Sequence, residues 1–202
     1  MGWESRITVV HNVAELHKAL VPMNIFSALG LGPKKTHVDD LYEVIVAHAR
    51  QPVFYTVLGV PDTVNGRYDV IMLHAYFVMK RLKAIGAEAS PASQALFDCM
   101  FLDMDKNLRE MGVGDLSVGK KVKAMATAFY GRIKAYDEGL EGGHEQLADS
   151  LRRNLFAEAE PTDRQVSVMA DFLSGQVQAS STWSLGHIEK GAISFITPPN
   201  DE

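Results

Sequence analysis

The chain has 202 residues, 47% of them hydrophobic, so it is long enough to bury a sizeable core within one domain. Its formal net charge of −5 argues against a protein that binds nucleic acid over its whole surface. The single cysteine, Cys99, excludes an intramolecular disulfide framework, which agrees with a reducing compartment such as the cytoplasm.

Apolar residues recur at helical spacing along most of the chain, which predicts an all-α fold. Thr36 or Asp39 can cap the first helix, and Pro52 ends it because proline disfavours the helical conformation of its predecessor. Residues 52–66 are expected to form a long connection that closes on the turn signal Asn65-Gly66. About six helices are predicted, near residues 39–50, 67–85, 91–111, 115–138, 144–157 and 161–183.

Glycine and proline mark several of these helix ends. Ser90-Pro91 opens the third helix, and Gly112 is a natural left-handed stop after it. Near the C-terminus, Ala192 to Ile196 alternate in hydrophobicity before two prolines, so a short extended arm is expected there. The chain is therefore divided into an N-terminal extension, a helical domain and a C-terminal arm, at residues 1–38, 39–183 and 184–202.

The first residues carry no recognisable targeting signal. Residues 1–22 lack the continuous apolar segment of a secretory signal and contain acids that suit a transit peptide poorly. No apolar run approaches the roughly 20 residues that cross a bilayer. The run after Met23 resembles a protein start, so residues 1–22 are interpreted as an extension upstream of the true start.

Residues Gly114 to Lys121 nearly match a nucleotide-binding loop but lack two of its physical requirements. That loop places a Ser or Thr hydroxyl after Gly-Lys to bind Mg²⁺, whereas Lys121 stands at this position. The loop also follows a buried strand, while residues 91–111 have the spacing of a helix. A glycine-rich turn between two helices explains the same residues.

Two acidic groups resemble the motifs with which all-α isoprenoid synthases hold Mg²⁺ against a diphosphate. They are Asp39, Asp40 and Glu43 in the first helix, and Asp98, Asp103 and Asp105 in the third. The second group does not form a tight ligand cluster at helical spacing, so solvated helix faces are the preferred interpretation. A Mg²⁺-dependent isoprenoid diphosphate enzyme is kept as an alternative.

No other pattern predicts a catalytic, metal or cofactor site. None of the seven histidines forms a metal-binding pair at helical spacing, and no serine has the context of a nucleophile elbow. His48 and His74 fall on apolar helical faces, where hydrogen-bonded core histidines are expected. Three methionines, Met100, Met104 and Met111, are expected to pack in the core. The chain is interpreted as a non-enzymatic protein without a cofactor.

A local basic patch stands out in this acidic chain. Residues 116–136 contain no acid but five basic residues, Lys120, Lys121, Lys123, Arg132 and Lys134. Lys120 and Lys121 lie near the start of a predicted helix and oppose its dipole by about 0.3–1 kcal/mol, which indicates that their charges have a partner. Tyr130 and Arg132 are of the residue types that dominate binding at protein interfaces.

Two segments of the chain resemble the ubiquinol–cytochrome c chaperone family, the assembly factors of the respiratory ubiquinol–cytochrome c reductase. Residues 41–74 read LYEVIVAHARQPVFYTVLGVPDTVNGRYDVIMLH, and residues 96–132 contain the runs MGVGDLSVGKKVK and AFYGR. The two runs are the specific part of the resemblance, which covers about half of the chain, from Leu41 to roughly Leu140.

The resemblance implies a chaperone that binds newly made cytochrome b and aids assembly of the reductase. A bacterial form in the cytoplasm, in peripheral contact with the inner membrane, is expected, with a second assembly factor or the ribosome as further partners and no DNA. A ribosome- or RNA-associated module that uses only the basic patch is a further alternative. The segments that match best predict a partner-binding surface made of Arg50, Phe54, Tyr55, Lys120, Lys121, Lys123, Tyr130 and Arg132.

Overall fold

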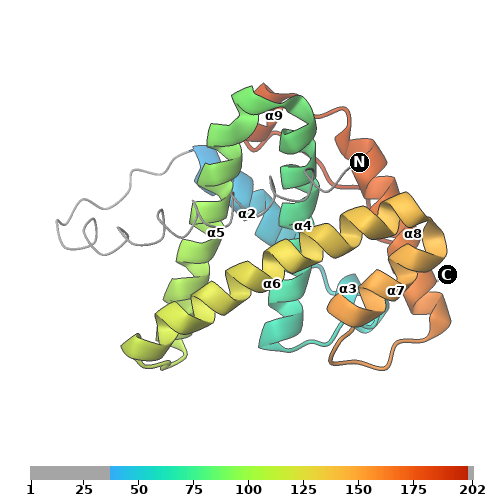
Figure 1. The fold of residues 1–202 in the computed structure, drawn as a ribbon, viewed down its shortest axis with the longest axis horizontal. Coiled ribbons are helices and arrows are strands. Elements are labelled where there is room, and N and C mark those ends of the chain that lie inside the picture. The colour runs from blue at the N-terminus through green and yellow to red at the C-terminus, as the bar shows by residue number, and fades with distance from the viewer. Residues whose placement is uncertain (1–36, 200–202) are drawn as a thin grey trace, which may run out of the picture. The chain divides into compact units, whose positions relative to one another are not determined.

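The computed structural model describes residues 37–199, and every regular element in that range is helical, which confirms the all-α class (Figure 1). Within the same range, no helix is long and apolar enough to cross a membrane. The α-helices are α2 (His37–Ala49), α3 (Val53–Thr56), α4 (Val64–Ile85), α5 (Ser90–Glu110), α6 (Asp115–Gly142), α7 (His144–Asn154), α8 (Asp163–Ser180) and α9 (Leu185–Glu189), with a 3₁₀ turn at Ala87–Ala89.

Local capping chemistry explains why several helices begin and end where they do. At the start of α8, the Thr162 side chain accepts a hydrogen bond from the backbone of Gln165, and the Gln165 side chain bonds back to the backbone of Thr162. This reciprocal capping box satisfies two backbone N–H groups that a helix start leaves unpaired. After α5, Gly112 adopts a φ of +80°, the left-handed stop that the sequence predicts.

Helix α4 is the centre of the core. Its residues 70–78 are all buried, and it contacts α2, α5, α8 and α9 (Figure 1). A helix segment that is buried on all sides must be covered by neighbours on all sides, which is the arrangement of residues 70–78. Met100 and Met104 of α5 are fully buried, as predicted, whereas Met111 after α5 is 50% exposed.

A pair of histidines joins α2 to α4 inside an aromatic cluster. Nδ1 of His74 lies 2.7 Å from the carbonyl oxygen of Val70, so this nitrogen must carry the hydrogen and donate it. Nε2 of His74 then accepts the hydrogen bond from Nδ1 of His48, 2.8 Å away. Rings from α3, α4, α8 and the C-terminal arm surround the pair, namely Phe54, Phe77, Phe172 and Phe195.

Burial keeps both imidazoles neutral. It lowers the pKa of His74 to about 3, while the hydrogen bond to Val70 acts in the opposite direction. Burial also lowers the pKa of His48, opposed by a hydrogen bond with the backbone of Ile196 in the C-terminal arm. The sequence-based interpretation of hydrogen-bonded core histidines is confirmed, and the structure adds that they are bonded to each other.

Helix α4 begins earlier than predicted. The Asn65-Gly66 turn signal lies inside its first turn, because the Thr63 side chain caps the helix by accepting a hydrogen bond from the backbone of Gly66. Glycine is needed there for space, since a Cβ at position 66 would lie 2.0 Å from the carbonyl oxygen of Pro61. The turn signal therefore reflects a close backbone approach at a helix start.

Two short helices lie where none was predicted. Helix α3 interrupts the connection after Pro52, and α9 occupies the first part of the segment expected to be an extended arm. The Ser184 side chain caps α9 by accepting from the backbone of His187. Beyond Gly191 the chain is non-helical, as expected, and Phe195 packs against Trp183 and the histidine pair. The predicted start at Met23, and nearly all of the predicted extension, lie outside the described residues.

The histidine pair makes stability depend on pH. The pKa of His74 is about 3 in the folded chain and about 6.5 when unfolded, so below pH 6.5 the unfolded state binds the extra proton. We expect the free energy of unfolding of the wild type, relative to that of His74→Asn, to fall by about 1 kcal/mol between pH 7.5 and pH 5.5. Urea unfolding at both pH values measures this difference. A difference that does not change with pH would show that His74 is already protonated or that the fold does not require it neutral.

Candidate functional site

The first predicted group, at the end of α2 and in α3, is split between surface and core. Arg50 is exposed. Phe54 is fully buried, with its ring 5.2 Å from that of His74 and 5.5 Å from that of Phe172. Tyr55 is half-buried, and its hydroxyl donates to the carbonyl oxygen of Ala49 at 2.9 Å. Phe54, which is predicted to bind a partner, is therefore enclosed in this structure, and its side chain holds α3 to the core.

Tyr130 lies at the edge of the contact between α5 and α6. Its ring stacks on Phe97 at a centroid distance of 5.6 Å, and the side chain is half-buried. Burial raises the pKa of Tyr130 to about 12, with a smaller contribution from the charge of Asp98. The phenol is thus neutral at physiological pH, and the side chain is partly accessible to solvent.

Arg132 is turned inward. It forms an ion pair with Asp69 of α4 at 2.8 Å, and the two side chains are only 17% and 14% exposed. Burial raises the pKa of Asp69 to about 6, although the charge of Arg132 opposes this shift. The charge of Arg132, which is predicted to bind a partner, thus serves in this structure to hold α6 against α4.

Further polar contacts along α6 have the same effect. Asp137 accepts hydrogen bonds from the hydroxyl of Tyr76 at 2.9 Å and the ammonium of Lys80 at 2.6 Å, both on α4. Between the Asp69–Arg132 ion pair and the hydrogen bonds of Asp137, the Nε of Arg132 and the hydroxyl of Tyr136 are buried without a hydrogen-bond partner among the described residues. The contact of α4 with α6 is therefore polar and fixes the rotation of α6 about its axis.

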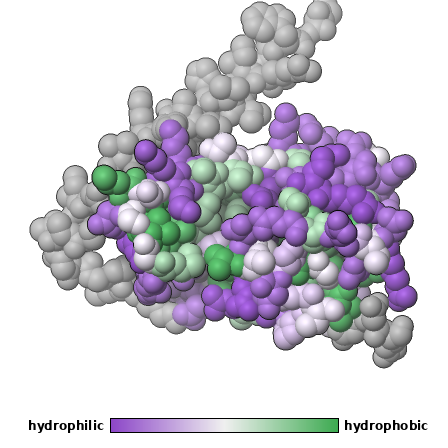
Figure 2. All heavy atoms as spheres, turned by 90° about the horizontal axis from the view of Figure 1, so that it is seen from below, coloured by the Kyte–Doolittle hydropathy of each residue, from purple (hydrophilic) through white to green (hydrophobic). Residues whose placement is uncertain are grey.

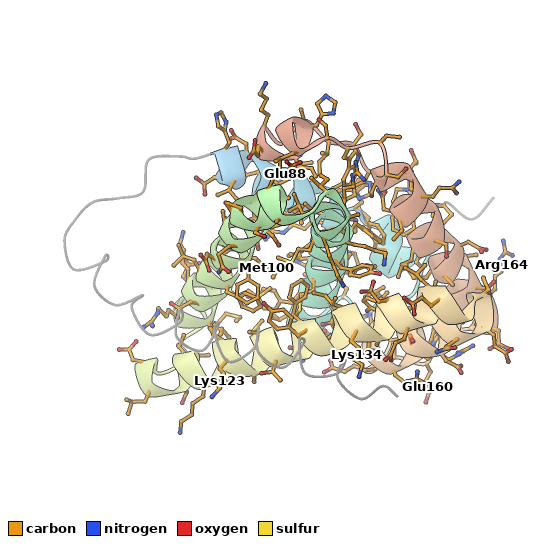
Figure 3. All side chains as sticks on the ribbon, turned by 45° about the horizontal axis from the view of Figure 1, so that its top comes forward. Glu88, Met100, Lys123, Lys134, Glu160 and Arg164 are labelled. Carbon is orange, nitrogen blue, oxygen red and sulfur yellow. The ribbon has the colours of Figure 1, made fainter. Side chains whose placement is uncertain are left out.

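The consequence of this fixed rotation is that the lysines of α6 point outward. Lys120, Lys121 and Lys123 are all exposed, and no described carboxylate lies within ion-pair distance of them. Lys123 and Lys134 lie along the same helix, which crosses the front of the view in Figure 3. Of the predicted partner-binding residues, the structure thus leaves at the surface Arg50, Lys120, Lys121 and Lys123, with Tyr55 and Tyr130 half-exposed.

The acidic groups of the alternative interpretation have other contacts. Asp103 accepts a hydrogen bond from the Tyr42 hydroxyl at 3.0 Å, and Asp105 pairs with Arg109 at 2.6 Å. Asp98 accepts from Gln94, and Asp39 from the thiol of Cys99. Within residues 37–199, no three potential ligands come together to hold a metal ion. These acids connect neighbouring side chains of α2 and α5.

Comparison with known proteins identifies the family to which the chain belongs. The family described as Ubiquinol-cytochrome C chaperone matches residues 56–195, which is more than half of the chain. The chain belongs to this family. The match includes α4 to α9 and all residues of the polar contact with α6.

Several relatives of the chain are named as assembly factors. The chain is 25% identical over 142 residues to the ubiquinol-cytochrome-c reductase complex assembly factor 1 of Xenopus laevis, which covers 70% of this chain and 71% of the frog protein. It is 27% identical over 149 residues to the mitochondrial protein CBP3 of Saccharomyces cerevisiae, covering 72% of this chain and 44% of the yeast protein. In the mouse assembly factor 1, the matched part is 42% of the protein at 27% identity. The match thus spans less than half of the yeast and mouse proteins.

A solved structure shows the same fold. The crystal structure of the Cbp3 homolog from Brucella abortus matches with a TM-score of 0.71 and 34% sequence identity, over 80% of this chain and 89% of that one. At this identity, both the helix arrangement and the family assignment are supported.

If Arg132 is structural, its removal should destabilise the fold. Arg132→Met leaves the buried carboxylate of Asp69 without its partner, and we expect a loss of about 3 kcal/mol in the free energy of unfolding at pH 7.5. Arg132 holds the pKa of Asp69 down, so its removal raises that pKa above about 6. The loss should therefore shrink as the pH falls towards 6 and stay constant below it, where Asp69 is protonated in both proteins. Chemical denaturation of this variant and of Arg132→Met/Asp69→Asn measures the effect, and the double variant should recover most of the stability.

Lys123→Met is the matched control, because this lysine is exposed and should change stability by less than about 0.5 kcal/mol. Equal stability of Arg132→Met and Lys123→Met would contradict the internal role of Arg132 and return it to the candidate surface.

Proposed function

We propose that this protein is a non-enzymatic chaperone that binds newly made cytochrome b during assembly of ubiquinol–cytochrome c reductase. The observation that carries the proposal is the family match over residues 56–195, joined to named relatives that are assembly factors of this reductase complex. The structure is compatible with a protein that acts by binding, since the buried polar groups of α4 and α6 serve to hold helices together.

The proposed partner-binding surface consists of the predicted residues that reach solvent. These are Arg50, Tyr55, Lys120, Lys121, Lys123 and Tyr130. Tyr130 is an anchor of the type enriched at interfaces, because its ring is held by Phe97 while part of the side chain stays accessible. The lysines add charge that can speed association with an acidic or anionic partner. We place the protein in the cytoplasm, at the face of the inner membrane where its client is inserted.

Affinity capture tests the client directly. We expect the tagged protein, recovered from gently solubilised membranes of its own source, to carry cytochrome b above an untagged control by mass spectrometry. Recovery of ribosomal proteins alone, lost at high salt, would replace this function with that of an RNA-associated module. Recovery of the bait alone would contradict the proposal.

Charge reversal tests the surface. Lys120→Glu/Lys121→Glu/Lys123→Glu should keep the helical circular dichroism spectrum and the unfolding midpoint, because the three side chains are exposed. We expect recovery of cytochrome b from membranes to fall at least about threefold, since close charge pairs at an interface contribute on the order of 1 kcal/mol or more. Unchanged recovery would remove the lysines from the client surface.

A further inference from the structure

The end of α6 that meets α5 combines exposed apolar and cationic side chains. Leu116, in the first turn of α6, is 93% exposed, and Met111, in the preceding connection, is 50% exposed. Among residues 37–199, only Val64 and Leu102 are further large hydrophobic residues with comparable exposure. We call the surface formed by Met111, Leu116, Lys120, Lys121 and Lys123 the α5–α6 tip. It lies at the opposite end of α6 from α7 and α8 (Figure 1).

Helical geometry puts the apolar and basic groups of the tip together. Lys120 and Lys123 follow Leu116 by four and seven residues, so the three side chains share one face of α6. The buried positions Val118, Val122 and Phe129 lie on the other face. Figure 2 shows hydrophobic side chains beside hydrophilic ones at the left end of the view, where α5 and α6 meet. The tip is therefore amphipathic along its outward face.

Three acids near the tip share two basic residues, so one negative charge remains among them. Arg109 pairs with both Asp105 and Asp115, and Glu110 lies 3.8 Å from the ammonium of Lys106. The three lysines of the tip outweigh this one remaining negative charge, on a chain whose total charge is −5. An anionic partner would balance the local positive charge.

The residue types select between two anionic partners. Nucleic acid binding favours arginine forks and aromatic stacking. The tip exposes lysines and aliphatic side chains, and its one nearby guanidinium, Arg109, is tied to Asp105 and Asp115. A lipid surface favours the opposite set, because headgroup phosphates attract point charges while aliphatic side chains enter the acyl boundary.

We propose that the α5–α6 tip binds the surface of an anionic lipid bilayer, with Leu116 and Met111 inserted below the headgroups and the lysines among them. Glu138 and Glu141, exposed near the other end of α6, would be repelled by the same surface, so the helix contacts the bilayer by its N-terminal turns. The inference rests on the proposed function only in that a membrane client requires a chaperone near the membrane.

Vesicle flotation of the purified full-length chain tests the proposal without any client. We expect binding to phosphatidylcholine vesicles that contain phosphatidylglycerol, weak binding to vesicles without it, and loss of binding as salt screens the charges. Lys120→Glu/Lys123→Glu should lower the partition coefficient more than about tenfold, since each lysine near an anionic surface contributes roughly fivefold. Leu116→Gln should lower it by about threefold or more, and it keeps good helix propensity.

Matched controls make the same chemical changes elsewhere. Arg153→Glu/Lys190→Glu alters net charge equally at two exposed positions outside the tip, and Val64→Gln removes another exposed aliphatic side chain. Both controls should bind vesicles like the wild type. Equal loss in tip and control variants, equal binding to neutral vesicles, or binding of single-stranded RNA in place of anionic vesicles would each overturn the proposal. Capture of cytochrome b in detergent alongside failed vesicle binding would overturn the tip alone and leave the chaperone function standing.

Discussion

The hydrogen bond between His48 and His74 is the contact on which the rest of the fold depends. It joins α2 to the buried middle of helix α4, and aromatic rings from α3, α8 and the C-terminal arm close around it. Two imidazoles can be buried this way only if each finds a partner and both stay neutral. His74 satisfies this by donating to Val70 and accepting from His48. Segments far apart in the sequence are thereby held around one polar pair in an apolar core.

With α4 fixed, its polar face determines how α6 lies. The Asp69–Arg132 ion pair and the bonds of Asp137 to Tyr76 and Lys80 set the rotation of α6. That rotation puts Phe129 into the core and the lysines into solvent. The contact of α6 with α4 therefore determines which basic residues reach the surface. Arg132 pairs with Asp69, whereas the lysines of the same helix are exposed. One run of basic residues thus contains both a structural ion pair and exposed charges.

Local chemistry explains which parts of the fold could be predicted. Thr162, Gln165 and Gly112 carry their helix signals within a few residues, and the apolar spacing of α4, α5 and α6 is unmistakable. Asn65-Gly66 has the pattern of a turn but lies in a helix, because the glycine is needed beside the carbonyl of Pro61, a contact that spacing does not reveal. Phe54 follows a proline in a predicted loop, and its burial depends on His74 and Phe172 far along the chain.

The candidate surface could also be predicted only in part from the sequence. Exposed lysines follow from a charged helix face, but the partner of Arg132 lies on another helix, and no sequence signal pairs it with Asp69. The exposure of Leu116 has a signal in the sequence, because Leu116, Lys120 and Lys123 have the i, i+4 and i+7 spacing of one helix face.

The proposed client binding and the proposed membrane contact would form one working arrangement, a helical chaperone on the bilayer into which cytochrome b is inserted. The measurement that tests this account most directly is removal of the protein from its source, followed by quantitation of cytochrome b and of assembled ubiquinol–cytochrome c reductase in the membrane. The account predicts that both fall while the cytochrome b message stays constant, and that the intact chain restores them. Normal amounts of assembled, active reductase without the protein would contradict it.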